Sequence, residues 1–130
     1  MSKCILSEMV TSGIRVKAVP SYIPENSRPE EEKYFFSYTI AITNETNVPV
    51  QLLSRHWIII NSEGDREEVT GPGVVGKTPL IEPGETFEYT SFCPLNTEWG
   101  TMEGSYRMID QHGSEFDVQI DRFVLVSDQI

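Results

Sequence analysis

The stretch YFFSYTIAIT, residues 34–43, decides the fold of this chain. Apolar side chains at the even positions Tyr34, Phe36, Tyr38, Ile40 and Ile42 alternate with polar ones at Ser37, Thr39 and Thr43. A period of two is typical of a β-strand that buries one face and exposes the other. We therefore predict a strand here, with the even-numbered residues in a core.

The rest of the chain repeats this period in several short runs. Such runs occupy residues 14–19, 67–70, 85–93, 101–110 and 116–125. The run VQLLSRHWIIIN, residues 50–61, differs because it carries apolar groups on both faces. It places Leu53, Arg55, Trp57 and Ile59 on one face and Leu52, Ser54, His56, Ile58 and Ile60 on the other. Apolar groups on both faces favour a strand in the middle of a sheet.

Two local irregularities refine this prediction. In the last run, Phe116, Val118 and Ile120 are even-numbered, whereas the apolar residues Phe123 and Leu125 are odd-numbered. We expect a β-bulge near Asp121 and Arg122 that returns Phe123 to the core face. Near the N-terminus, Pro20 fits only an edge position or the end of a strand, because proline donates no hydrogen bond.

The connecting segments are rich in Pro, Gly, Asn and Asp, as in SYIPENSRPEEEK, TNETNVP, NSEGD, EPGE and DQHGS. No window of ten or more residues has the period of an amphipathic helix. About seven short strands with turn signals between them predict an all-β protein, an immunoglobulin-like or fibronectin type III-like β-sandwich. We expect one domain over residues 1–130.

Composition narrows the partners. The 130 residues include 20 Asp and Glu against 10 Lys and Arg, a formal charge of −10, which repels nucleic acid. The sequence has neither a secretory signal pattern nor 18 consecutive apolar residues, so we expect no membrane insertion and a soluble, cytoplasmic protein. In that reducing compartment Cys4 and Cys93 are expected to be free thiols. The sequence leaves monomer or homodimer open.

The segment GPGVVGKT, residues 71–78, matches the spacing of a phosphate-binding P-loop and also that of G-x-G-x-x-G. Both motifs require a following helix, but Pro79 and the Pro83-Gly84 pair leave room for barely one turn. A glycine-rich connection between strands is one interpretation. The other is a non-catalytic cradle for phosphate, pyrophosphate or a nucleotide, formed by Gly71, Gly73, Gly76, Lys77 and Thr78.

Two further clusters are candidates for function. Arg55, His56 and Trp57 combine arginine with aromatic side chains, as interaction hot spots do, although Trp57 also fits a core position and His56 a structural one. Asp110, His112 and Glu115 lie in one turn and offer ligands for a divalent cation, although polar side chains are also ordinary in a hairpin turn. We predict no catalytic residues and no cofactor, because no nucleophile, base and orienting group can be assigned.

The sequence resembles the ApaG family. The resemblance rests on RHWIIINSEG, EEVTGPGVVGKTPLIEPGETFEYTS, GTMEGSY from Gly100 to Tyr106 and the apolar spacing from Phe116 to Leu125. The glycine motif of the family falls on Gly71, Gly73 and Gly76. Its other strong positions fall on Arg55, Trp57, Pro83, Gly84, Tyr89, Ser91, Gly100, Met102, Gly104 and Tyr106. Lys77 departs from the acidic residue that is usual in the family, and Cys93 and Pro94 replace smaller or more flexible residues.

The resemblance implies a fibronectin type III-like sandwich without an established reaction. In bacteria the genes of the family are associated with cobalt tolerance and magnesium efflux, and CorD is an alternative name. In eukaryotes a similar domain is attached to certain F-box proteins and to a polymerase-associated protein, which implies a partner-binding role. We therefore expect a non-enzymatic protein-interaction module. The alternatives are an anion- or nucleotide-binding protein, for which weak phosphohydrolase activity stays open, and a divalent-cation-binding protein.

Overall fold

The computed structural model describes residues 5–127. Within this range the chain forms strands joined by short connections, with two 3₁₀ turns and no α-helix. The elements are β1 (Ser7–Thr11), β2 (Ile14–Tyr22), η1 (Pro24–Asn26), η2 (Pro29–Glu31), β3 (Tyr34–Asn44), β4 (Val50–Asn61), β5 (Arg66–Pro72), β6 (Leu80–Ile81), β7 (Thr86–Leu95), β8 (Trp99–Asp110) and β9 (Glu115–Val126).

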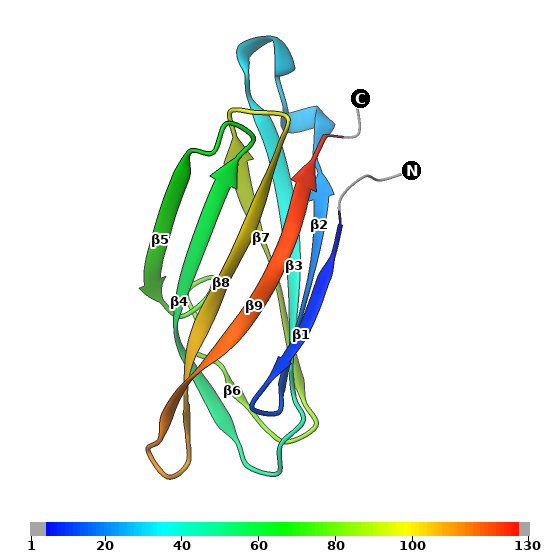
Figure 1. The fold of residues 1–130 in the computed structure, drawn as a ribbon. Coiled ribbons are helices and arrows are strands. Elements are labelled where there is room, and N and C mark those ends of the chain that lie inside the picture. The colour runs from blue at the N-terminus through cyan, green and yellow to red at the C-terminus, as the bar shows by residue number, and fades with distance from the viewer. Residues whose placement is uncertain (1–4, 128–130) are drawn as a thin grey trace.

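The strands form two antiparallel sheets that pack face to face (Figure 1). One sheet has the order β1-β2-β3-β7, and the other has the order β5-β4-β8-β9 with the two-residue β6 paired to β4. The predicted β-sandwich is confirmed. The seven predicted strands are β2, β3, β4, β5, β7, β8 and β9, whereas β1 and β6 were not expected.

Strand β3 supplies the centre of one core face, as its alternation predicts. Phe36, Tyr38, Ile40 and Ile42 are buried, and the residues between them lie in the outer face. Tyr38 reaches across to the other sheet, where its ring contacts those of Trp57 and Phe123.

Two β-bulges set which residues face this core. Between the pairs Met102↔Phe123 and Gly104↔Ile120, Asp121 and Arg122 of β9 oppose a single residue of β8. This confirms the predicted bulge and explains why both Ile120 and Phe123 are buried.

The second bulge, at Leu53 in β4, corrects the sequence interpretation. The prediction placed Leu52 and Trp57 on opposite faces, but the register between β4 and β8 shifts between Leu52 and Ser54. As a result both Leu52 and Trp57 lie in the core. The pattern hid this bulge because Leu52 and Leu53 are equally apolar, so parity alone did not reveal the shift.

The two lateral sides of the sandwich differ. On one side β9 lies against β1, and Ile5 and Val124 exchange two backbone hydrogen bonds of 3.2 and 3.1 Å. The other side is flanked by β5 and β7, which are the edge strands of their sheets. Pro94 fits this arrangement because an edge strand tolerates a missing N–H, and β7 runs past it to Leu95. Pro20 likewise lies beyond the last residue of β2 that pairs with β1.

Within residues 5–127 no helix has the length and the apolar character needed to cross a membrane.

Candidate functional site

The glycine segment of residues 71–78 is a tight hairpin that leaves β5 and returns towards β6. Val74 and Lys77 exchange backbone hydrogen bonds of 2.8 and 2.9 Å, and the amide of Gly73 donates to the carbonyl of Leu53 at 2.8 Å. These three amides are therefore used inside the protein. No helix follows, because the chain continues into β6. The backbone does not present Gly73, Val74 and Lys77 as amide donors for a phosphate.

The turn residues of this hairpin are Val75 and Gly76, with φ of 42° and 79°. Positive φ at both central positions defines a type I′ geometry, which glycine adopts readily and valine does not. Gly73 is needed for a different reason, since a Cβ there would collide with the carbonyl oxygen of Lys77. The glycines thus have structural roles in the hairpin.

Arg55 of β4 connects this hairpin to the interior. Its Nη1 donates to the carbonyl oxygens of Pro72 at 2.9 Å and Gly73 at 3.0 Å. Gly71, its partner on β5, leaves space for the guanidinium, which lies 3.0 Å from where a Cβ would stand. Among the described residues no carboxylate forms an ion pair with Arg55. Within residues 5–127, Arg55 is thus a half-buried cation whose hydrogen bonds go to backbone carbonyls only.

Two adjoining pockets open beside Arg55, between β4 and β5 on one side and β3 and β7 on the other. We call them the loop lobe, of about 340 Å³, and the strand lobe, of about 300 Å³. Both are lined by Tyr38, Arg55, Trp57 and Ser91, and together they form what we call the Arg55 cleft. Tyr38 and Ser91 are directly opposite each other on β3 and β7. The pairing of β3 with β7 therefore places Tyr38 and Ser91 on one wall of the cleft. Arg55 and Trp57 reach the cleft from β4 in the other sheet.

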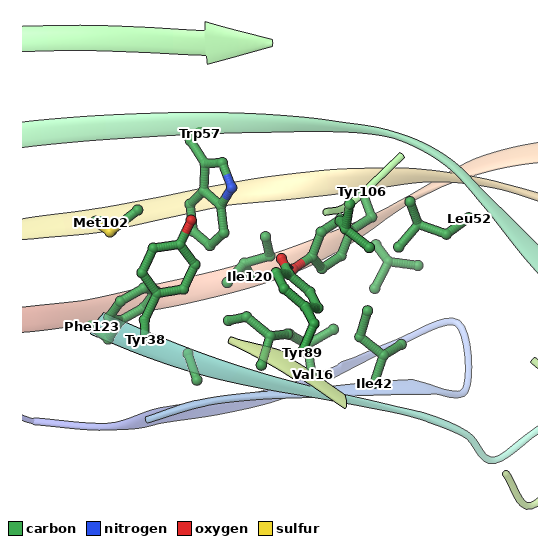
Figure 2. Packing of buried hydrophobic residues seen from close by; sticks show 14 of the residues in the cluster. Val16, Tyr38, Ile42, Leu52, Trp57, Tyr89, Met102, Tyr106, Ile120 and Phe123 are labelled. Atoms are coloured by element: carbon green, nitrogen blue, oxygen red, sulfur yellow. Dashed lines mark hydrogen bonds between the residues drawn. The ribbon is translucent and has the colours of Figure 1, made fainter. Parts of the chain in front are cut away.

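The loop lobe also contains Val74, Val75, Gly76 and Tyr89. Figure 2 shows Tyr89 and Tyr106 reaching towards each other from opposite layers, and their hydroxyl oxygens are 2.5 Å apart. Burial raises the pKa of Tyr38, Tyr89 and Tyr106 above the ordinary tyrosine value. For Tyr38 a hydrogen bond from Ser91 and the positive charge of Arg55 oppose that rise. These phenols therefore stay neutral near pH 7 and remain hydrogen-bond donors.

The strand lobe has a different character. Ile59, Val69, Cys93 and Met102 give it an apolar lining, and Glu67 lies in its wall. Cys93 is a free, buried cysteine, as predicted, and burial raises the pKa of its thiol to about 12. The prediction for Cys4 concerns a residue outside the described range. A protonated thiol in this lobe acts as a small apolar group.

The structure separates the three residues of the Arg55, His56 and Trp57 cluster. Trp57 is buried against Tyr38, Tyr106 and Phe123, and its edge-on contacts place it in the core as well as in the wall of the cleft (Figure 2). His56 points to the outer face of its sheet, where its Nε2 lies 3.8 Å from a carboxylate oxygen of Glu68. Arg55 and Trp57 therefore share a site from which His56 is excluded.

The turn residues Asp110, His112 and Glu115 are not brought together as a set of metal ligands. One oxygen of Asp110 accepts hydrogen bonds from the backbone amides of His112 and Ser114, at 2.8 and 3.0 Å, which closes the turn. Glu115 pairs instead with Arg107. Over the part of the chain that the structure describes, no group of three His, Cys, Asp or Glu side chains is arranged to hold a metal ion.

Tyr38, Tyr89 and Ser91 are cleft residues that sequence reasoning did not select as a site. Tyr38 was predicted as a core residue, and Tyr89 and Ser91 entered only as strong positions of the family. No short motif could have identified them together with Arg55, because the cleft is assembled from several strands.

The fold and the cleft together define a class of protein, an immunoglobulin-like or fibronectin type III-like β-sandwich with an arginine-containing cleft on its open side. The family model described as the ApaG domain matches residues 24–110. Protein ApaG of Dechloromonas aromatica is 51% identical over 114 residues, which cover 88% of this chain and 90% of that protein. Protein ApaG of Anaeromyxobacter dehalogenans is 51% identical over 121 residues, which cover 93% of this chain and 95% of the relative.

Solved structures agree with this relationship. The crystal structure of the ApaA protein from Bordetella pertussis matches with a TM-score of 0.87 at 46% sequence identity, and the match covers 95% of this chain and 97% of that one. The chain belongs to the ApaG family.

Proposed function

We propose that this ApaG-family protein is a non-enzymatic interaction module that binds a protein partner on its open side, between β5 and β7. The observation that carries the proposal is the Arg55 cleft, where a half-buried guanidinium with no carboxylate partner among the described residues lies beside Trp57. Half-buried arginine next to aromatic residues is the composition of an interaction hot spot. The edge strands on both sides of the cleft also offer unpaired backbone groups to a binding chain.

Phe92 extends this surface at the rim of the strand lobe. Its side chain is 56% exposed and stacks on Phe35 with ring centroids 5.5 Å apart. Both rings lie on the outer face of their sheet, beside the strand lobe, where they add apolar area that a partner removes from water.

We further propose that this interaction serves cobalt tolerance and magnesium efflux, as membership of the family suggests. In this view the metal ions are the cargo of the partner system, and this chain regulates that system by binding it. The proposal places the protein in the cytoplasm, where a free thiol such as that of Cys93 stays reduced.

Affinity capture from a native lysate with matched variants tests this function. Phe92→Glu puts a charge at the mouth of the cleft, and Val10→Glu puts the same charge on β1, a strand of the opposite side. We expect a partner that is retained by the wild type and by Val10→Glu and is lost with Phe92→Glu. Equal capture by both variants would contradict a binding surface between β5 and β7.

A second arm tests the connection with metal ions. Complementation of a strain that lacks the gene should restore growth in cobalt with the wild type and with Val10→Glu, but not with Phe92→Glu. Restoration by all three would separate metal tolerance from this surface.

A further inference from the structure

We propose that the Arg55 cleft binds the C-terminal carboxylate of a peptide, with the last side chain of that peptide in the strand lobe. This inference rests on the proposed function and specifies the chemical group that the partner supplies. It assigns the anion site to Arg55 and the hydroxyl groups around it, not to the amides of the glycine hairpin.

The charge of the loop lobe is the first argument. The whole sequence carries −10, yet among the described residues that line this lobe none is acidic. Arg55 supplies a positive charge there, and Tyr38 and Ser91 supply neutral hydroxyl groups. The hydroxyl of Tyr89 is used inside the protein by its hydrogen bond to Tyr106. A carboxylate accepts hydrogen bonds from guanidinium and hydroxyl donors, and such charge-assisted bonds are about twice as strong as neutral ones.

The hydrogen bonds of Arg55 are the second argument. Both of its bonds to the hairpin carbonyls come from Nη1, and among the described residues neither Nε nor Nη2 has a hydrogen-bond partner. Anchoring through one nitrogen fixes the guanidinium while its other donors remain available. A guanidinium fixed in advance loses less conformational entropy when it binds a carboxylate.

The strand lobe determines the direction of the ligand. Its apolar lining from Ile59, Val69 and Met102 suits an aliphatic or aromatic side chain, whereas Glu67 in its wall repels a carboxylate. The negative group is therefore directed to the loop lobe and the apolar group to the strand lobe. The two lobes meet at Arg55 and Trp57, so a carboxylate and an apolar side chain on the same residue fit them together.

The overall charge restricts the rest of the peptide. A protein with twice as many acidic as basic residues repels an acidic chain, so the carboxylate must be an isolated negative group on a neutral or basic segment. The free edges of β5 and β7 allow the peptide backbone to add to a sheet, a recognised way of binding extended peptides.

The test uses short peptide probes and follows the backbone amide and arginine side-chain NMR signals of the isotope-labelled 130-residue protein. The probes are N-acetyl-Gly-Gly-Val, -Leu, -Met and -Phe as free acids, each with its C-terminal amide as control, at up to about 10 mM to cover millimolar Kd values. We expect at least one acid to shift the backbone amide signals of Ser91, Val75 and Gly76. The same acid should shift the Nε–H signal of Arg55. Its amide should bind at least about tenfold more weakly, since a charge-assisted hydrogen bond is lost.

Variants separate a role in binding from a role in folding. Tyr38→Phe removes one hydroxyl from the cleft, and Arg55→Lys keeps the charge but loses the planar donor group. Arg107→Lys is the matched control, because Arg107 lines neither lobe of the cleft and its exposed side chain pairs with Glu115 and Asp117. Both cleft variants should weaken binding of the acid by about threefold or more relative to Arg107→Lys, with Tyr38→Phe judged alone if Arg55→Lys unfolds the hairpin.

Several results would overturn the inference. Equal binding of acid and amide would show that the carboxylate is not recognised. A lack of saturable shifts with all four acids would show that the cleft does not bind a peptide C-terminus. Inorganic phosphate that shifts the same signals and displaces the acids with equal affinity would make this a site for free anions. These outcomes do not decide the proposed function, which is tested separately by partner capture. If the partner is lost with Phe92→Glu and these probes do not bind, the protein still has a partner-binding surface, but its ligand is not a C-terminal carboxylate.

Discussion

Val75 provides a direct test of the hairpin that supports the cleft. It is a β-branched residue at φ 42°, in the left-handed region, and its side chain is 51% exposed. Left-handed geometry costs an L-residue about 1–2 kcal/mol, and asparagine tolerates it best among the residues with a Cβ. Because little apolar area is buried at this position, Val75→Asn should raise the free energy of unfolding by about 1 kcal/mol.

This energy converts to a measurable shift in melting temperature. For 130 residues the entropy of unfolding is about 0.27 kcal/mol/K, so 1 kcal/mol raises Tm by about 4 °C. Thermal and urea unfolding followed by circular dichroism would measure both quantities. Val75→Thr is the control, because threonine is also β-branched and should leave Tm nearly unchanged. A Tm for Val75→Asn at or below that of the wild type would refute the type I′ assignment.

Three other predictions follow from buried and hydrogen-bonded polar groups. Tyr22→Phe should raise the free energy of unfolding by about 1 kcal/mol, because among the described residues the buried hydroxyl of Tyr22 has no hydrogen-bond partner; a loss in urea unfolding would contradict this. Tyr89→Phe should cost about 1–3 kcal/mol by leaving the buried hydroxyl of Tyr106 unpaired, and the double Phe variant should cost less than the sum of the two single variants. Backbone hydrogen bonds lower the pKa of Asp110, so its carboxylate stabilises the fold above the unfolded pKa near 3.9, and this contribution is lost as pH falls through the folded pKa. Asp110→Asn should therefore be less stable than wild type at pH 7. A difference in unfolding free energy between the two that stayed the same at about pH 3 would contradict this.

The fold could be predicted where apolar residues occupy either the odd or the even positions of a strand, but not both. In the last strand the change from even to odd positions located the bulge at Asp121 and Arg122, because polar residues separate the apolar positions up to Arg122. In β4 the same reasoning failed at Leu53, where both parities are apolar and a one-residue shift leaves no trace in the pattern. Strand β1 escaped detection for a related reason, since Met9 and Val10 are adjacent apolar residues without alternation.

The site was less predictable because its residues meet only in three dimensions. The most conspicuous motif, at residues 71–78, is a hairpin in which the amides of Gly73, Val74 and Lys77 are used internally. Among the described residues, Arg55, sixteen positions before Gly71, carries donors without a partner. Tyr38 and Ser91 are far apart in sequence and come together only through the pairing of β3 with β7. A pattern of glycines identifies where a backbone must turn, but it does not show where its N–H groups point.

Arg55 also distinguishes an anchor from a binding group. If its only role were to hold the hairpin, its guanidinium would be expected to use its donors on the protein and to be covered by neighbouring side chains. Instead, one nitrogen makes both bonds to the carbonyls of Pro72 and Gly73, and Arg55 lines both lobes of the cleft. Gly71 keeps this position open, since a side chain there would press on the guanidinium. Arg55 therefore fixes the loop and also presents a cation. The NMR test with Arg55→Lys and Tyr38→Phe separates these two roles. Tyr38→Phe should leave the hydrogen bonds from Arg55 to the hairpin intact and weaken only the binding of the anion.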